Sequence, residues 1–518
     1  MTVTRRELTL LAIGLAAMTL AFLSAASPRA QIADAPLVQA SDLTYVGAFR
    51  VPAGGDDQHT FSYGGTALQF DSRDGGLWMV GHAQQQRAAE ISIPTPSAST
   101  SLADLPRAAL KRDFTDLLAG KMGSIGSGEA HVGGILPWGD GLIVSAYLYY
   151  DGSGSQQLSH FAVSADGTVS GPYRIGSART GMVSGYMTPI PSEWQSALGG
   201  PALTGQCCIP IISRTSFGPS ATVFDPSALS NQSKAVQVVG YPNEHQNLGG
   251  YYDTDLSHAF LMATSIGGLV FPSGTRSVLF FGAQPGSVCY GEGTSDQSKV
   301  GQPVDGTIWC YDPTSIYKGN HGYPWRPFIW AYDANDLVAV KQGTKNPWDL
   351  KPYATWTLPA PLASQDASTV LGATYEPATR RIYVSLGDAD GRAPIVAVYQ
   401  LAVGAATPPV VTPPDGTIEP TPPQDSPSGT DAAVTADAPT ATISAATCRV
   451  TSIKAKMPQG GGWTAEFFDS DKSLGKDAGG PATRPAQTVT SGVHSLTVRW
   501  TKAGHDPVVT PPLVLECQ

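Results

Sequence analysis

Four segments of the chain repeat one pattern: a glycine, a short apolar strand, a turn rich in Asp, Gly or Pro, and a second apolar strand. The segments begin at Gly65, Gly134, Gly250 and Gly372. Two strands joined by a tight turn form a hairpin, and hairpins that recur along a chain of this length are typical of radially repeated folds. The pattern therefore predicts an all-β protein whose hairpins form the blades of a β-propeller.

The spacing of these openings predicts the number of blades. The first two glycines, Gly65 and Gly134, are 69 residues apart, whereas Gly250 and Gly372 are 122 apart, which we interpret as two blades. A degenerate blade is expected within 175–245, where Ser220–Phe224 supplies a strand. About six blades result, and five to seven fit the spacing. Residues 44–50 are expected to pair with 395–401 and close the ring, which removes the exposed sheet edges.

A proline-rich segment divides the chain. Nine prolines lie between Pro408 and Pro439, among Thr, Asp, Gly and Ser. Such a composition cannot bury a core and is typical of an extended linker. We therefore expect a β-propeller domain over 40–403, a linker over 404–439 and a small domain over 440–518. Short alternating strands in the small domain predict an immunoglobulin-like β-sandwich.

The N-terminus has the features of an export signal. Arg5 and Arg6 precede an apolar stretch that runs from Leu8 to about Ala26, and small-residue cleavage patterns end at Ala30 and Ala35. The twin arginine also resembles a twin-arginine export motif. The alternative is an uncleaved membrane anchor. We expect residues 1–30 to be a signal peptide, and the mature protein to be secreted or periplasmic with no membrane span.

The six cysteines suit an oxidising compartment. Cys448 and Cys517 bracket the small domain and are expected to form a disulfide. Cys289 and Cys310 flank a glycine-rich excursion and are the natural second pair. For the adjacent Cys207 and Cys208 the sequence leaves open a vicinal disulfide, two free thiols or bridges elsewhere.

Composition excludes several classes of partner. Charged residues make up 14% of the chain and the formal net charge is −10, which argues against binding to nucleic acid. The sequence contains no phosphate-binding loop and no dinucleotide fingerprint, so we expect no nucleotide.

Three histidines stand just upstream of a Gly-Gly pair that opens a strand: His59, His131 and His245. Glu129 and Glu244 lie beside two of them. In a propeller, the loops that enter the innermost strands meet at one mouth of the central channel. These side chains are therefore expected to lie around one channel mouth.

Three interpretations of this group compete. Imidazole and carboxylate together can bind a divalent metal ion such as calcium, zinc or manganese. Histidine with tyrosine and arginine can carry acid–base catalysis. Alternatively, the histidines hydrogen-bond backbone groups and hold the blades together. The catalytic candidates are His131, His245, Tyr252 and Arg276, and the substrate-binding candidates are His59, His82, Glu129, Glu244 and Trp325, whose indole ring could stack on a sugar.

The export signal, the glycine-opened blades and the histidine-bearing loops resemble secreted bacterial β-propeller proteins, among them the propeller glycoside hydrolases and polysaccharide lyases. The resemblance is architectural and covers about 360 residues. It implies a secreted carbohydrate-active enzyme that acts on an extracellular polysaccharide or cell-surface glycan. Lyase chemistry, with a His or Tyr base, suits the residues better than hydrolysis, which needs two facing carboxylates. The alternative is a non-catalytic propeller that binds a glycan or a protein.

Overall fold

The computed structural model describes residues 32–209, 212–242, 248–249, 257–261, 263–359 and 369–403, together with strands between 441 and 517. Its contacts divide the chain into two compact units, Met1–Val410 and Val411–Gln518. The predicted signal peptide, 1–30, and the whole of the predicted linker, 404–439, lie outside the described residues. Within the described part, no helix is long and apolar enough to cross a membrane.

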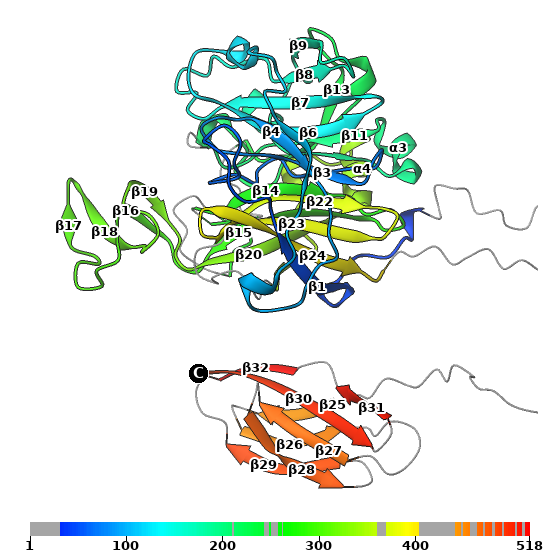
Figure 1. Ribbon diagram of the computed structural model, residues 1–518, viewed down its shortest axis with the longest axis vertical. Coiled ribbons are helices and arrows are strands. Elements are labelled where there is room, and N and C mark those ends of the chain that lie inside the picture. Colours follow the sequence, from blue (N-terminus) through cyan, green and yellow to red (C-terminus); the bar gives the residue numbers. More distant parts are fainter. Residues whose placement is uncertain are drawn as a thin grey trace, which may run out of the picture. The chain divides into compact units, whose positions relative to one another are not determined.

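The first unit is all-β apart from short helices, and it contains five four-stranded antiparallel sheets (Figure 1). Four of the sheets follow chain order. The first sheet consists of β2 (Gln69–Asp71), β3 (Gly76–Val80), β4 (Ala88–Ile91) and β5 (Leu110–Thr115), and the second of β6 (Ala130–Trp138), β7 (Gly141–Leu148), β8 (His160–Val163) and β9 (Val169–Tyr173). The third sheet consists of β10 (Met187–Pro189), β11 (Ala202–Thr204), β12 (Ala221–Phe224) and β13 (Ala235–Val239). The fourth consists of β14 (Ser265–Val270), β15 (Ser277–Pro285), β20 (Trp325–Asp333) and β21 (Ala354–Thr357).

The fifth sheet joins the two ends of the unit. It consists of β22 (Val370–Glu376), β23 (Arg381–Asp390), β24 (Ala393–Leu401) and the first strand of the chain, β1 (Leu43–Arg50). β1 pairs antiparallel with β24, from Leu43 opposite Leu401 to Arg50 opposite Ile395. The expected pairing of 44–50 with 395–401 is therefore confirmed.

The first strands of the five sheets contact one another in cyclic order. β2 contacts β6, β6 contacts β10, β10 contacts β14, β14 contacts β22, and β22 contacts β2. Glycine is needed where these strands approach most closely. A Cβ atom on Gly133 would lie 1.9 Å from the carbonyl oxygen of Ser184, and one on Gly372 would lie 2.6 Å from the Cβ of Leu68. Close approach of the neighbouring strand thus requires glycine at Gly133, beside the predicted opening Gly134, and at the predicted opening Gly372.

Buried apolar residues fill the space between each sheet and the next. In the part of the chain that the structure describes, five cores are each formed by side chains from two successive sheets. Two members, one from each sheet, identify each core: Trp78 and Val144, Ile143 and Met187, Val223 and Phe280, Phe281 and Val384, and Val396 and Met79. The fifth core lies between the last sheet and the first, so the packing has the same cyclic order as the strand contacts.

A small sheet is inserted between β15 and β20 and projects from the rest of the unit (Figure 1). We call it the arm. It contains β16 (Cys289–Thr294), β17 (Pro303–Val304), β18 (Thr307–Tyr311) and β19 (Lys318–His321). The expected Cys289–Cys310 disulfide joins β16 to β18. Buried His321 of β19 contacts Asp312 through its Nδ1, at 2.9 Å.

Two α-helices pack against each other, α3 (Ser192–Leu198) and α4 (Ala334–Lys341). The side chain of Asp333 caps α4 by accepting a hydrogen bond from the backbone of Asn335. Single-turn 3-10 helices lie in the connections: η1 (Ala40–Asp42), η2 (Leu102–Asp104), η3 (Met122–Ile125), η4 (Thr180–Met182), η5 (Ile212–Arg214), η6 (Pro226–Ala228) and η7 (Pro347–Asp349).

The second unit is built from antiparallel strands. One sheet contains β25 (Ala441–Ala446), β26 (Arg449–Ala455) and β29 (Ala482–Thr488). The other contains β28 (Lys472–Ala478), β27 (Thr464–Asp469), β30 (Gly492–Lys502), β31 (His505–Val509) and β32 (Leu513–Cys517). Trp500 of β30 is fully buried. Cys448 lies outside the described residues, so the expected Cys448–Cys517 bridge stays a prediction.

Candidate ligand-binding site

A cavity of about 230 Å³ lies where the five sheets meet. Each sheet supplies a lining residue at or just before its first strand: Thr66, Val132, Tyr186, Ile266 and Leu371. The cavity is therefore at the end of the sheets where the first strands begin. This is the end to which the sequence analysis assigned the site.

A second, larger cavity of about 560 Å³ extends from the first toward the arm. Tyr149, Cys208, Ile209 and Ser265 line both cavities, so the two lie side by side. We call the pair the aromatic cleft, because Tyr149 and Tyr150 follow β7, Tyr290 lies on the arm and Trp325 begins β20, and all four line the larger cavity.

The side chains of the cleft are mainly apolar or aromatic. Tyr149, Tyr150 and Tyr290 are large side chains that stay 47%, 66% and 49% exposed. Among the described residues that line the two cavities, Lys318 is the one charged side chain and none carries a carboxylate. An uncharged ligand with flat apolar faces matches this lining better than an ionic one.

Cys207 and Cys208 form a disulfide in the wall of the cleft. Of the alternatives that the sequence left open, the vicinal disulfide is the one present. The backbone of Cys208 has φ of 70°, the left-handed region that residues other than glycine rarely adopt.

His131 lies on β6 beside the cleft, with its two ring nitrogens engaged. Its Nδ1 lies 3.1 Å from Gln86 Nε2, and its Nε2 lies 3.1 Å from Glu129 Oε1. The amide nitrogen donates, so Nδ1 accepts and Nε2 carries the proton that faces the carboxylate. Burial lowers the pKa of His131, against the opposing effect of Glu129.

The ring of His131 also stacks on Tyr147, with ring centroids 5.5 Å apart. Burial raises the pKa of Tyr147 to about 12. A neutral histidine beside a neutral phenol is chemically able to accept a proton, but the Glu129 or Gln86 contact would first have to break. The observed contacts fit the interpretation in which histidines join neighbouring loops.

His59 and His82 lie on loops at the same end of the sheets. His59 Nδ1 pairs with Asp56 at 2.8 Å. His82 follows β3 and packs edge-on against Tyr63, with ring centroids 5.8 Å apart. Neither these two histidines nor His131 line the cleft.

The other predicted site residues divide into three cases. Trp325 lines the cleft, as the expected sugar-stacking role requires. Arg276 lies in the turn between β14 and β15, at the far end of that hairpin from Ser265. There its Nε pairs with Asp333 at 3.2 Å. Glu244, His245 and Tyr252 lie outside the described residues.

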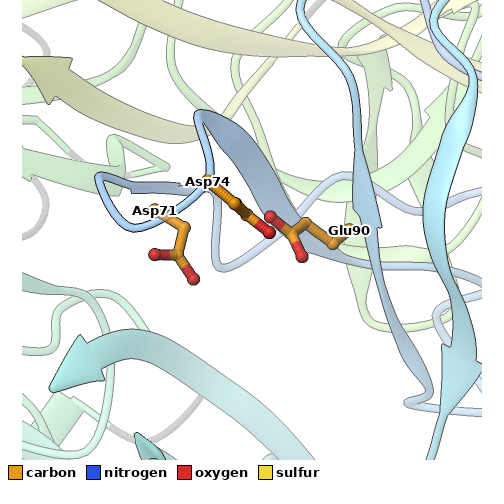
Figure 2. Close-up of side chains that lie close together, drawn as sticks. All are labelled: Asp71, Asp74 and Glu90. Carbon is orange, nitrogen blue, oxygen red and sulfur yellow. The ribbon is translucent and has the colours of Figure 1, made fainter. Parts of the chain in front are cut away.

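A group of carboxylates lies at the opposite end of the first sheet from the cleft (Figure 2). It consists of Asp71 at the end of β2, Asp74 in the following turn and Glu90 on β4. One oxygen of each lies within 4.8 Å of the others, and no other such group of three potential metal ligands occurs among the described residues.

Three cations neutralise these carboxylates. Arg73 Nη2 lies 2.5 Å from Asp71, Lys111 Nζ lies 3.0 Å from Asp74, and Arg112 Nε lies 2.8 Å from Glu90. A divalent metal would have to displace all three. The group is therefore best described as an ion-pair network that holds the β2–β3 turn to β4 and β5.

The carboxyl of Glu90 is fully buried and lies beside that of Asp74. Burial, and then the neighbouring Asp74, raise the pKa of Glu90 to about 7, whereas the pKa of Asp74 is lowered to about 2. The close pair thus keeps one proton near neutral pH, as expected of two carboxyls in contact.

Sequence reasoning missed most of the cleft. Tyr149, Tyr150 and Tyr290 stand in loops or at a strand end, without the glycine signal that identified the blades. The adjacent cysteines were visible in the sequence, but nothing there placed them beside the first strands.

No protein-family model matches the chain, and no curated protein matches it in sequence. The extracellular domain of a one-component system from B. thetaiotaomicron is similar at 9% identity and a TM-score of 0.24, and the match covers 91% of this chain and 58% of that one. The extracellular domain of a hybrid two-component system from the same organism is similar at 9% identity and a TM-score of 0.26, over 91% of this chain and 57% of that one. The chain thus spans less than three fifths of either structure, and similarity this low supports no statement on function.

Proposed function

We propose that this protein binds a neutral glycan in the aromatic cleft, outside the cytoplasm, without turning it over. The observation that carries the proposal is the gathering of three exposed tyrosines and Trp325 around one cleft. Sugar rings present flat C–H faces that pack on aromatic rings, so exposed aromatics in a concave site suit a carbohydrate.

The charges of the cleft favour a neutral ligand and a binding role. A hydrolase needs two facing carboxylates, and the described part of the lining supplies none. A lyase acting on an acidic sugar needs cations to neutralise the sugar carboxylate, and Lys318 is the single cation among the described residues of the lining. The enzymatic hypothesis therefore has less support than non-catalytic binding, the alternative that the sequence left open.

We infer that the five sheets of the first unit form a five-bladed β-propeller. The cyclic contacts of the first strands and the five cores between successive sheets support this inference. Five lies in the range expected from the sequence but below the favoured six. The two-sheet arrangement of the second unit, with its buried Trp500, supports the immunoglobulin-like assignment.

The location outside the cytoplasm follows from the disulfides. Cys207–Cys208 and Cys289–Cys310 are present in the structure, and such bonds persist in oxidising compartments. Secretion through the predicted signal peptide is part of the same proposal.

Affinity gel electrophoresis of the full chain tests the function. Xylan, glucomannan and mixed-linkage β-glucan serve as neutral polysaccharides, and alginate and polygalacturonate as acidic ones. We expect at least one neutral polysaccharide to retard the protein, and Trp325→Ala to weaken that binding about tenfold or more. The matched control is Trp348→Ala, an exposed tryptophan on η7 that does not line the cleft.

If none of the neutral polysaccharides retards the protein, the proposed binding is wrong. Each mixture is also assayed for unsaturated product by ultraviolet absorbance and for new reducing ends. A rise in either one contradicts the non-catalytic role and identifies a lyase or a hydrolase, respectively.

A further inference from the structure

We propose that the Cys207–Cys208 disulfide and Thr215 form a sugar subsite within the aromatic cleft. In this subsite the two sulfurs contact the apolar face of a pyranose ring and the Thr215 hydroxyl bonds to one of its hydroxyls. This inference rests on the proposed function and names the part of the cleft that holds the ring.

The disulfide occupies the junction of the two cavities. Cys207 and Cys208 both line the smaller cavity, and Cys208 also lines the larger one. A ligand that extends from the meeting point of the sheets toward Trp325 therefore passes beside this disulfide.

The structure holds this loop in an unfavourable backbone conformation. Cys208 has φ of 70°. Just before the disulfide, the Gln206 backbone N–H donates to the Met182 carbonyl at 3.0 Å, and Cys207 itself forms a β-bridge with Ser216. A residue kept in a rare conformation by its surroundings is often found where a ligand is bound.

Thr215 supplies an independent observation. Its side chain is 2% exposed and lines the larger cavity. Its Oγ1 is buried and has no hydrogen-bond partner in the part of the chain that the structure describes. Buried hydroxyls nearly always have a partner, so a hydroxyl without one in the wall of a cleft points to a polar group that a ligand brings.

The chemistry of the two groups is complementary. A disulfide is polarisable and has only weak hydrogen-bonding capacity, so it packs on C–H groups without leaving a strong donor or acceptor unpaired. A hydroxyl both donates and accepts, as the hydroxyls of a sugar do. In the proposed subsite the disulfide contacts the face of a pyranose, and the Thr215 hydroxyl contacts a hydroxyl at its edge.

Two variants of the full chain, each with a matched control, test the subsite. The double variant Cys207→Ser, Cys208→Ser removes the sulfurs, and its control is Cys289→Ser, Cys310→Ser in the arm. Thr215→Val removes the hydroxyl and keeps the shape. Its control is Thr222→Val on β12, where Oγ1 is also buried without a partner but lies outside the cleft.

The probe is whichever of xylan, glucomannan and mixed-linkage β-glucan retards the unaltered protein most. We expect the Cys207, Cys208 double variant to bind about tenfold more weakly and Thr215→Val about fivefold more weakly, with each control within about twofold. Thermal melting establishes that each variant is folded. If the double variant does not fold, the binding of the Thr215→Val variant alone tests the subsite.

The outcomes separate the two proposals. If Trp325→Ala loses binding while folded Cys207, Cys208 and Thr215 variants keep it, the subsite is wrong and glycan binding stands. If the unaltered protein binds none of the three polysaccharides, both are wrong.

Discussion

Arg50 on the first strand of the chain forms a bidentate ion pair with Asp390 at the end of β23, 340 residues later. Arg50 Nε lies 2.7 Å from Asp390 Oδ2, and Nη2 lies 2.8 Å from Oδ1. The two side chains are 25% and 15% exposed, so solvent screens the pair only in part. Paired parallel bonds of this kind are the stronger form of charge-assisted hydrogen bond.

Arg50→Met is expected to lower the free energy of unfolding by about 1–3 kcal/mol, because Asp390 loses its bidentate partner. Arg50→Lys, which keeps the charge but not the fork geometry, should recover only part of that loss. Urea denaturation of both variants measures the difference. Equal stability of Arg50→Lys and the unaltered protein would show that charge alone suffices.

Glu90 should give the stability a definite pH dependence. Its pKa is raised to about 7 from an ordinary value of 4.5. Between these two pH values the folded protein holds a proton that the unfolded chain releases. The stabilising contribution of Glu90 is therefore fully present below pH 4.5 and is lost as the pH rises through 7.

Glu90→Gln tests this dependence. The difference in unfolding free energy, unaltered protein minus variant, should fall as the pH rises from 4.5 to 7. His160, whose pKa burial lowers to about 3, has the opposite effect below pH 6.5, but it is present in both proteins and cancels. Asp140→Asn, at an exposed carboxyl in the turn between β6 and β7, serves as the control. A Glu90 difference that is flat with pH contradicts the assignment.

Gln86 connects the loop after β3 to β6. Its Oε1 accepts a hydrogen bond from the buried Val132 backbone at 2.6 Å, and its Nε2 donates to His131. Gln86→Ala should therefore cost about 1–3 kcal/mol of stability, because the Val132 N–H is left without a partner. Chemical denaturation measures the loss, and Gln85→Ala, at the exposed neighbouring side chain, should change stability by less than about 0.5 kcal/mol.

The N-terminal segment should be needed for full stability. The carbonyl oxygen of Ala33 accepts hydrogen bonds from Arg276 Nη1 at 3.0 Å and Asn335 Nδ2 at 2.9 Å. Ile32 packs against the core formed by the third and fourth sheets. A chain that begins at Pro36 loses these contacts and should melt at a lower temperature than one that begins at Gln31.

The same contacts favour the earlier of the two cleavage patterns, the one that ends at Ala30. Mass spectrometry of the exported protein identifies the mature N-terminus directly. A mature chain that begins at Pro36, with unimpaired thermal stability, would contradict the structural role of Ile32 and Ala33.

The strand repeats could be predicted from the sequence because each first strand needs glycine where it meets its neighbour. The number of sheets was predicted less accurately, with about six expected and five present. The arm is inserted within the fourth sheet, between β15 and β20, and it lengthens the interval from Gly250 to Gly372 so that one sheet has the spacing of two.

The candidate site could be predicted only in part. The glycine openings and the aromatic cleft lie at the same end of the sheets, and Trp325 lines the cleft. His59, His82 and His131 lie at that end too, but short-range partners such as Asp56 and Glu129 hold them outside the cleft. Arg276 illustrates a different limit, because a hairpin places its two ends far apart and residue type alone does not tell which end a side chain occupies.

The pairing of β1 with β24 has a consequence for biosynthesis. The ribosome makes β1 first, yet its partner emerges only after almost the whole first unit, since Leu43 and Leu401 are 358 positions apart (401 − 43). Until then β1 lacks its partner strand. Folds dominated by contacts between distant residues form slowly, so we expect the pairing of β1 with β24 to be a slow step. The two ends of the unit lie side by side once it has closed. A circularly permuted chain, with these ends joined and a new break opened in a turn between sheets, should therefore fold to the same structure.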